Sequence, residues 1–419
     1  MPRDVTFHDA GIHSPILRTL NATGAAAARI GWTLPRLDAE ELIDAARHQA
    51  GLEDFGDDRF RAGLKALLDS LEVDAQLTTF GRMVQKKMLT RFLTARLHVT
   101  DWNKAHPETN QETIRAPWVI AGLPRTGTTL LSHLLELDPR NRSLLGWEAL
   151  DPAPPGAPES TEIRARIARA EKDDKQLNQL IPPLQAMHPM EPTLPTECVT
   201  LFACDFRSLL FSTQTPIPGY ARWLQDAEVD SSYEFHRSVL QLLQCGREPR
   251  RWSLKTPQHL WSFAALFRTY PDARVIWTHR DPRKVVPSVA SLNMAFYRTF
   301  TKDPDPEMVG QEWNRELSIG VRKGMEFDKQ ADPDWCAHLL YEELMEDPIA
   351  ALRKVYTVFG EELLEDHAEA IRQWLRQRPQ SNFGRHRYDA KDFGMNVDEI
   401  GDAFSTYIER LDIPRERRD

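Results

Sequence analysis

A glycine-rich segment between residues 122 and 129 has the clearest capacity for chemistry in this sequence. Gly122 and Gly127 stand five residues apart, and glycine lets the backbone turn so tightly that successive N–H groups point to one place. Side-chain donors lie between and after the two glycines: Arg125, Thr126, Thr128 and Thr129. An apolar run precedes the segment and a helical pattern follows it, so a helix N-terminus would add partial positive charge. These features predict a cradle for a phosphate or sulfate group.

The spacing of the two glycines is close to that of the nucleoside-triphosphatase loop, G-x-x-x-x-G-K-[ST]. Thr128 stands where that loop has its lysine. Without the lysine the segment lacks the group that bridges the outer phosphates, which disfavours an ATPase or a GTPase. Two other functions remain as alternatives to a transferase: a P-loop nucleotide-binding module, and a small-molecule kinase that uses ATP.

Two further basic positions follow apolar runs. Arg280 follows the run 274–278, and Ser288 lies eight residues later in an expected helix. The guanidinium, the hydroxyl and the N-terminus of that helix can all face one phosphate. Lys255 ends the run 251–255, and a lysine at the carboxyl end of a parallel strand faces the ligand crevice of such folds.

The elements that must position these residues are short strands separated by helices. Strands are predicted at 118–121, 251–255 and 274–278. Helices are predicted by apolar periodicity at 39–49, 60–71, 84–99, 128–137, 161–180, 196–210, 233–245 and 263–270. Alternation of this kind predicts an α/β fold with a parallel β-sheet flanked by helices. We divide the chain into a helical N-terminal region (1–115), an α/β core (116–395) with a proline-rich excursion at 151–160, and a helical tail (396–419).

Together, the three basic motifs resemble the sulfotransferases that use 3′-phosphoadenosine-5′-phosphosulfate (PAPS), in particular the bacterial branch of that family. The resemblance covers about residues 116–395 and implies a P-loop-like fold. It implies that the donors Arg125, Thr126, Gly127, Thr128 and Thr129 hold the 5′-phosphosulfate. It also implies that Arg280 and Ser288 hold the 3′-phosphate, and that Lys255 contacts the phosphosulfate.

The sequence departs from the animal cytosolic members in two places. Those proteins have a catalytic histidine two residues after the lysine, where this chain has Pro257, with His259 two residues further on. They also end in a glycine- and lysine-rich phosphate segment. Here the corresponding segment contains His386 and Tyr388, which we assign to the 3′-phosphate or the adenine by their similarity to the bacterial branch.

Sulfuryl transfer requires an aligned acceptor, a base for its proton and positive charge beside the leaving phosphate. We expect Lys255 and Arg125, with the backbone N–H groups of Gly127 to Thr129, to stabilise the bridging and phosphate oxygens. The candidates for the base are Glu197, His259 and His188, and Glu197 is preferred because its apolar setting would raise its pKa. No carboxylate set is arranged for magnesium, so we expect no metal.

The acceptor is expected to be a lipophilic alcohol, a phenol or a sterol-like molecule, with a sugar hydroxyl as the next choice. The eleven tryptophans, together with Tyr220, Phe235 and Tyr297, are candidates for the lining of an apolar pocket. The N-terminal helices would form a lid or a wall of that pocket.

Composition limits the other functions. The 419 residues carry a net charge of −9, which argues against a broad nucleic-acid-binding face. The four cysteines form no C-x-x-C pair and are expected to be reduced thiols. No apolar stretch is long enough for a transmembrane helix, and no secretory signal is recognisable, so we expect a cytoplasmic protein. It would act on a small molecule, either alone or as a homodimer.

Overall fold

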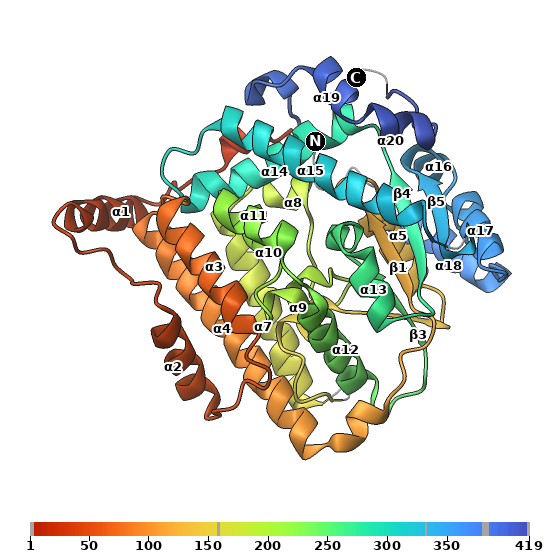
Figure 1. The fold of residues 1–419 in the computed structure, drawn as a ribbon, viewed down its shortest axis with the longest axis horizontal. Coiled ribbons are helices and arrows are strands. Elements are labelled where there is room, and N and C mark those ends of the chain that lie inside the picture. The colour runs from red at the N-terminus through yellow and green to blue at the C-terminus, as the bar shows by residue number, and fades with distance from the viewer. Residues whose placement is uncertain (1–3, 157–159, 332, 379–384, 417–419) are drawn as a thin grey trace.

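A five-stranded parallel sheet forms the centre of the α/β part of the molecule (Figure 1). The structure is a computed structural model that describes residues 4–156, 160–331, 333–378 and 385–416. The strand order is β2-β3-β1-β4-β5. The strands are β1 (Trp118–Gly122), β2 (Asn141–Ser143), β3 (Arg251–Lys255), β4 (Arg274–His279) and β5 (Cys336–Leu340). All four pairings are parallel, which confirms the predicted α/β class.

The register of the sheet brings the three predicted motifs to one edge. In β1, Ile120 pairs with Lys255 and Gly122 pairs with Thr278. All five residues of β1 are buried, as a central strand covered on both faces requires. Helix α5 (Thr128–Glu136) begins after β1 and helix α14 (Pro282–Phe300) begins after β4, both at the carboxyl edge.

The first third of the chain is helical, as predicted. It forms α1 (Pro15–Ala28), α2 (Ala39–Ala50), α3 (Phe60–Val73) and α4 (Thr79–Ala105). These helices share a hydrophobic core with the sheet: the rings of Phe60 and Phe206 lie 6.2 Å apart. Buried Arg96 also pairs with Asp205 at 3.1 Å. The division of the chain at 115/116 and 395/396 stays a prediction.

The helix predicted over 196–210 is not formed. The structure has two short helices instead, α9 (Val199–Ala203) and α10 (Leu210–Gln214). Between them Phe206 adopts a left-handed backbone with φ of 55°. Fully buried Asp205 accepts hydrogen bonds from four side chains: those of Arg96, Arg207, Ser231 and Ser232. Satisfying this buried carboxylate outweighs the local helical preference, because an unpaired buried charge is costly.

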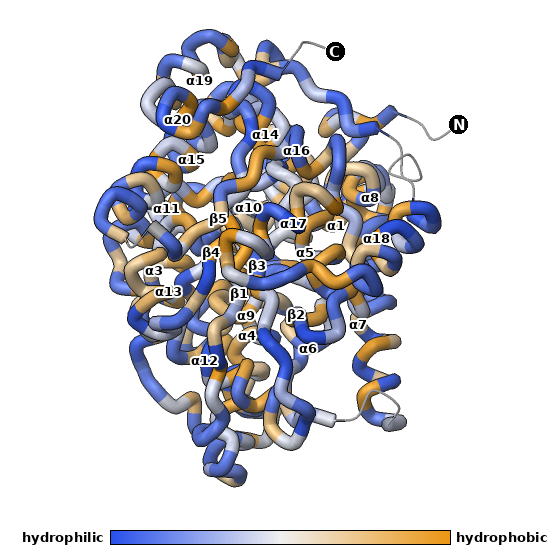
Figure 2. Tube along the Cα trace, turned by 90° about the vertical axis from the view of Figure 1, so that its right-hand side faces the viewer, coloured by the Kyte–Doolittle hydropathy of each residue, from blue (hydrophilic) through white to orange (hydrophobic). Residues whose placement is uncertain are grey.

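The remaining helices surround the sheet and the N-terminal helices. They are α6 (Gly146–Leu150), α7 (Thr161–Leu180), α8 (Leu184–Met187), α11 (Pro218–Asp226), α12 (Asp230–Gln244), α13 (Phe263–Thr269), α15 (Pro306–Asp328), α16 (Tyr341–Glu346), α17 (Pro348–Val358), α18 (Glu365–Gln377), α19 (Val397–Ala403) and α20 (Ser405–Arg410). Outer helices such as α18 are largely hydrophilic (Figure 2). None of the helices in the described ranges is long and apolar enough to cross a membrane.

Candidate active site at the carboxyl edge of the sheet

The loop between β1 and α5 has the glycine-dependent geometry that the sequence predicts. Gly127 has φ of +85°, and a Cβ there would lie 2.9 Å from Leu344. Gly122 has φ of +139°, and a Cβ there would lie 2.5 Å from the Thr278 carbonyl oxygen. A larger residue would therefore displace the loop at either position. Thr126 serves the loop itself, because its buried hydroxyl donates to the Leu123 carbonyl at 2.7 Å.

The two predicted anion sites are adjacent. Arg125 lies in the left-handed region with φ of 68°, and its Nε donates to the Ser288 hydroxyl at 3.2 Å. The Nη1 of Arg280 donates to the carbonyl oxygen of Arg125 at 2.9 Å. The Arg280 guanidinium thus reaches from the end of β4 into the loop, and the Arg125 guanidinium reaches from the loop to α14. Arg125, Arg280 and Ser288 are thus joined by hydrogen bonds at the carboxyl edge of the sheet.

The carboxylate of Glu416 is the unexpected partner of Arg280. It accepts from Nε and Nη2 of Arg280 at 2.6 and 3.0 Å, in the fork geometry that a phosphate would also use. The ring of Tyr341 lies beneath the guanidinium, with 4.0 Å to its centroid. The backbone N–H of Glu416 donates to Asp281 at 3.1 Å, which fixes the C-terminal segment at the start of α14.

Lys255 lies where the loop meets a large cavity. Its side chain is only 3% exposed, and its Nζ lies 3.1 Å from Glu197 and 3.5 Å from the Thr129 hydroxyl. Burial raises the pKa of Glu197, but the charge and the hydrogen bond of Lys255 outweigh it, so that the pKa is lowered overall. The expectation of a raised pKa is therefore wrong. Glu197 is ionised at neutral pH, which is the form a general base needs.

The two histidine candidates for the base lie in different places. His188 lines the cavity, and burial lowers its pKa to about 4. His259 is fully buried in the core: its Nδ1 lies 2.9 Å from the Tyr233 hydroxyl, and its ring packs edge-on against Phe202. It is not one of the described residues that line the cavity. Of the three candidates for the base, Glu197 and His188 line the cavity.

A third histidine, His133, lines the cavity and was missed by the sequence analysis. It lies four residues after Thr129 on α5, so both side chains project from the same face of the helix. Burial and the nearby Lys255 lower its pKa to about 4. The helical spacing from Thr129 was the signal that could have identified it.

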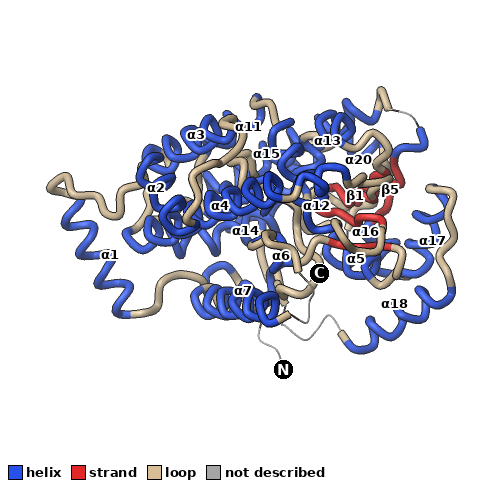
Figure 3. The backbone as a smooth tube through the Cα atoms, turned by 90° about the horizontal axis from the view of Figure 1, so that it is seen from below, coloured by secondary structure: helices blue, strands red, loops and turns tan. Residues whose placement is uncertain are grey.

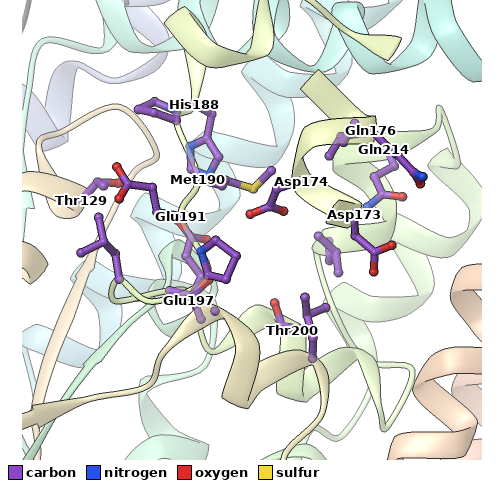
Figure 4. Close-up of a pocket in the computed structure, with 18 of the residues that line it drawn as sticks. Thr129, Asp173, Asp174, Gln176, His188, Met190, Glu191, Glu197, Thr200 and Gln214 are labelled. Atoms are coloured by element: carbon purple, nitrogen blue, oxygen red, sulfur yellow. The ribbon is translucent and has the colours of Figure 1, made fainter. Parts of the chain in front are cut away.

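The cavity beside Lys255 has a volume of about 1260 Å³. Thr129, His188 and Glu197 lie on one side of it, and Asp173, Gln176 and Gln214 lie on the other (Figure 4). Its apolar lining comes from widely separated helices and includes Phe80, Met83, Val84, Met88, Phe92, Leu177, Leu180, Phe296, Phe300 and Trp374. Of the aromatic candidates from the sequence, the tryptophan Trp374 lines the cavity. Tyr220, Phe235 and Tyr297 are instead buried in the core, where the Tyr297 hydroxyl donates to the Ser212 carbonyl.

His386 and Tyr388 lie beside the loop. The Nε2 of His386 lies 2.8 Å from the Ser291 hydroxyl on α14, and its ring centroid is 5.1 Å from that of Tyr388. Burial, together with nearby Arg125, lowers the pKa of His386 to about 3. His386 is therefore neutral at physiological pH and offers a hydrogen bond rather than a charge. Within the described ranges, no three His, Cys, Asp or Glu side chains gather in a way that could hold a metal ion.

A parallel sheet with a glycine loop after its central strand and basic residues at the neighbouring strand ends defines the P-loop-like α/β class. Comparison with known proteins identifies the family within that class. A model of the sulfotransferase family matches residues 117–366, and the chain belongs to this family. The resemblance and the P-loop-like fold predicted from the sequence are thereby confirmed.

Two groups of similar proteins come from mycobacteria. The chain is 29% identical over 272 residues to the omega-hydroxy-beta-dihydromenaquinone-9 sulfotransferases Stf3 of Mycobacterium bovis and Mycobacterium tuberculosis. That match covers 62% of this chain and 66% of each relative, slightly less than two thirds. The crystal structure of sulfotransferase STF9 from Mycobacterium avium aligns with a TM-score of 0.84 at 30% identity, over 92% of this chain and 100% of that one. Sulfotransferase STF1 from Mycobacterium tuberculosis H37Rv aligns with a TM-score of 0.80 at 29% identity, over 88% and 98%.

Proposed function

We propose that this protein transfers the sulfuryl group of PAPS to a hydroxyl of a small lipophilic acceptor. One observation carries the proposal: the Lys255 ammonium lies between the loop, through Thr129 at 3.5 Å, and the acceptor cavity, through Glu197 at 3.1 Å. When the sulfuryl group passes from the donor to the acceptor, negative charge develops on the leaving phosphate. A cation between the anion cradle and the apolar cavity lies where it can stabilise that charge. Membership of the sulfotransferase family supports the same reaction.

The donor would bind across the two adjacent anion sites. The N-terminus of α5, with Thr128 and Thr129, would hold the 5′-phosphate, since its free N–H groups and dipole favour an anion. Arg280 and Ser288 would hold the 3′-phosphate, which would replace the Glu416 carboxylate as the partner of Arg280. His386 and Tyr388, beside Arg125, would lie on the adenine side.

The donor supplies an already activated sulfuryl group, a mixed anhydride of sulfate and phosphate. A bond forms between the acceptor oxygen and sulfur, and the bond between sulfur and the 5′-phosphate oxygen breaks. Glu197 takes the hydroxyl proton, and Lys255 and Arg125 neutralise the departing phosphate. The Lys255–Glu197 ion pair keeps the carboxylate ionised and aimed at the cavity before an acceptor arrives.

The apolar lining of the cavity supports a lipophilic acceptor. Aromatic, methionine and leucine side chains from α4, α7 and α14 dominate that lining. The Stf3 relatives are named for an omega-hydroxy-beta-dihydromenaquinone-9 substrate, and we place the acceptor of this chain in the same lipophilic class. Polar groups on the wall opposite Glu197, including Asp173 and Gln214, would contact a second polar group of the acceptor.

Replacing Glu197 tests the base. Glu197→Gln should lower kcat by about 10²- to 10⁴-fold, the usual contribution of a general base. In the wild type, activity is lost as pH falls through the lowered pKa of Glu197, so the acid limb should lie below the ordinary glutamate value of 4.5. The matched control is Glu191→Gln, because Glu191 also lines the cavity but pairs with Arg378. An unchanged kcat in Glu197→Gln would remove this residue from the chemistry.

Ligand preference separates the proposal from the two ATP-dependent alternatives. A thermal-shift comparison should show stabilisation by adenosine 3′,5′-bisphosphate without magnesium, because binding to the folded state raises the melting temperature. A nucleotide-binding module or a kinase predicts larger stabilisation by ATP or GTP with magnesium. Stabilisation only by a magnesium nucleotide would refute the sulfotransferase assignment.

A further inference from the structure

Helix α1 is the one helix of more than one turn in the described chain for which no residue is buried. It projects from the body of the molecule beyond α3 and α4 (Figures 1 and 3). One side of α1 rests on the beginning of α4: Leu17, Leu20 and Gly24 are half-buried, and a Cβ at Gly24 would collide with the Thr79 side chain. The Asn21 side chain accepts from the backbone N–H of Phe80 at 2.9 Å. The opposite side of α1 is exposed, and contact with a further surface would stabilise it, because isolated helices of this length are marginal in water.

Large apolar side chains are exposed on α1 and on the loop that follows it. Ile16 is 79% exposed, Ile30 74%, Trp32 68% and Leu34 59%. Several large apolar side chains exposed within one short segment of a folded protein mark a contact with another apolar phase or another protein. Tryptophan and isoleucine beside basic residues are typical of segments that lie in the interface of a bilayer.

The charge of this segment is opposite to that of the whole protein. Between Asp9 and Asp38 the sequence has no acidic residue and three arginines, Arg18, Arg29 and Arg36, all of them exposed. The complete chain carries −9. A positive segment on an acidic protein favours an anionic surface. In a two-fold dimer through α1, the arginines of one copy would face the arginines of the other copy. The repulsion between like charges disfavours a second copy of this chain as the partner.

The segment also lies against the part of α4 that lines the acceptor cavity. Asn21 binds the backbone of Phe80, and Phe80 and Met83 both line the cavity. Arg82, which precedes the 48% exposed Met83 on α4, donates to the Pro35 carbonyl at 2.8 Å. The exposed segment is therefore held against the beginning of α4 at two places.

We propose that α1 and the loop to Leu34 bind the surface of an anionic lipid bilayer. Ile16, Ile30, Trp32 and Leu34 would insert between the headgroups, while the three arginines contact lipid phosphates. The cavity wall at Phe80 and Met83 would then lie next to the lipid, so that a lipophilic acceptor would enter the cavity without crossing water. This last step rests on the proposed function, whereas the bilayer contact itself does not.

Vesicle flotation with the full-length protein tests the contact. The wild type should float with vesicles of phosphatidylcholine mixed with phosphatidylglycerol, and much less with phosphatidylcholine alone. Ile30→Ser combined with Trp32→Ser should lower the bound fraction at least about tenfold, because two inserted side chains are lost. Val358→Ser combined with Leu364→Ser is the matched control, since both residues are exposed apolar side chains, at the end of α17 and directly before α18.

Three outcomes would overturn the proposal. The first is that the wild type does not float with anionic vesicles. The second is that the control pair loses flotation as much as the Ile30/Trp32 pair. The third is that light scattering shows a dimer that Ile30→Ser with Trp32→Ser converts to a monomer, which would make α1 an interface between copies. Binding of adenosine 3′,5′-bisphosphate, measured by calorimetry on the same proteins, should be equal in all variants. Its absence from the wild type would refute the proposed function and leave the vesicle result standing.

Discussion

The donor end and the acceptor end of the site are built in different ways. At the donor end, Lys255, Arg125 and Arg280 come from three neighbouring strand edges, and each has a polar partner at hydrogen-bond distance. At the acceptor end, side chains as distant in sequence as Phe80 and Trp374 form one apolar wall. Charge and backbone geometry define the donor end, and the size of the side chains defines the acceptor end.

This contrast indicates that the donor end determines the reaction and that the acceptor end determines which acceptor binds. The donor end depends on a left-handed Gly127 and on buried ion pairs, so a single substitution leaves a charge without its partner. The acceptor end has no comparable network among its apolar residues, so a substitution there changes shape. We therefore expect donor-end variants to lose turnover or nucleotide binding, and acceptor-end variants to change acceptor preference.

The largest effect is expected at Lys255. Lys255→Met should lower kcat by about 10²- to 10³-fold, because it removes the cation that stabilises the leaving phosphate. Loss of the ammonium should also raise the pKa of Glu197 and move the acid limb of the pH profile toward neutrality. Steady-state kinetics across pH measure both effects, with Lys87→Met, another lysine of the cavity lining, as the control. Equal kcat for the two variants would contradict the assignment.

A smaller and different effect is expected at Phe296 on the acceptor wall. Phe296→Ala should raise the KM of a lipophilic acceptor about tenfold, because apolar contact with the acceptor is lost. The affinity for adenosine 3′,5′-bisphosphate should not change. Kinetics with several acceptors, combined with calorimetry, distinguish the two ends. If nucleotide affinity falls while the acceptor KM stays constant, the division between the ends is wrong.

The smallest effect is expected at Glu416, which the donor would displace from Arg280 under the proposed function. Glu416→Gln should tighten binding of adenosine 3′,5′-bisphosphate about three- to tenfold, because a partly buried ion pair with Arg280 no longer competes. Calorimetry measures this change, with exposed Glu399→Gln as the control. Weaker binding in Glu416→Gln would mean that Glu416 positions Arg280 instead of competing for it.

The sequence predicts the donor end because its signals are local. The glycine spacing, the strand-end Lys255 and the Arg280–Ser288 pair can each be recognised within about ten residues of sequence. The parallel sheet follows from the alternation of apolar runs and helices. Strand β2 was missed because Asn141, Arg142 and Ser143 are polar, and β5 because a histidine interrupts its apolar run.

The acceptor end could not be predicted in the same way, because its residues meet only through tertiary packing. Phe296 and Tyr297 are neighbours on α14, yet one lines the cavity and the other is core, since successive helical residues point about 100° apart. Aromatic content alone cannot distinguish the two. The pKa of Glu197 was predicted in the wrong direction for a similar reason: its partner, Lys255, is 58 residues away in sequence.

The central claim is that two adjacent anion sites hold opposite ends of one adenine nucleotide. Calorimetric titration of the wild type and of Arg280→Ala with adenosine 3′,5′-bisphosphate and with adenosine 5′-monophosphate tests it most directly. The wild type should prefer the bisphosphate about 10- to 100-fold, from charged hydrogen bonds to the 3′-phosphate, and Arg280→Ala should lose most of this preference because only Ser288 remains. A preference of the same size in both proteins, or none in the wild type, would contradict the account.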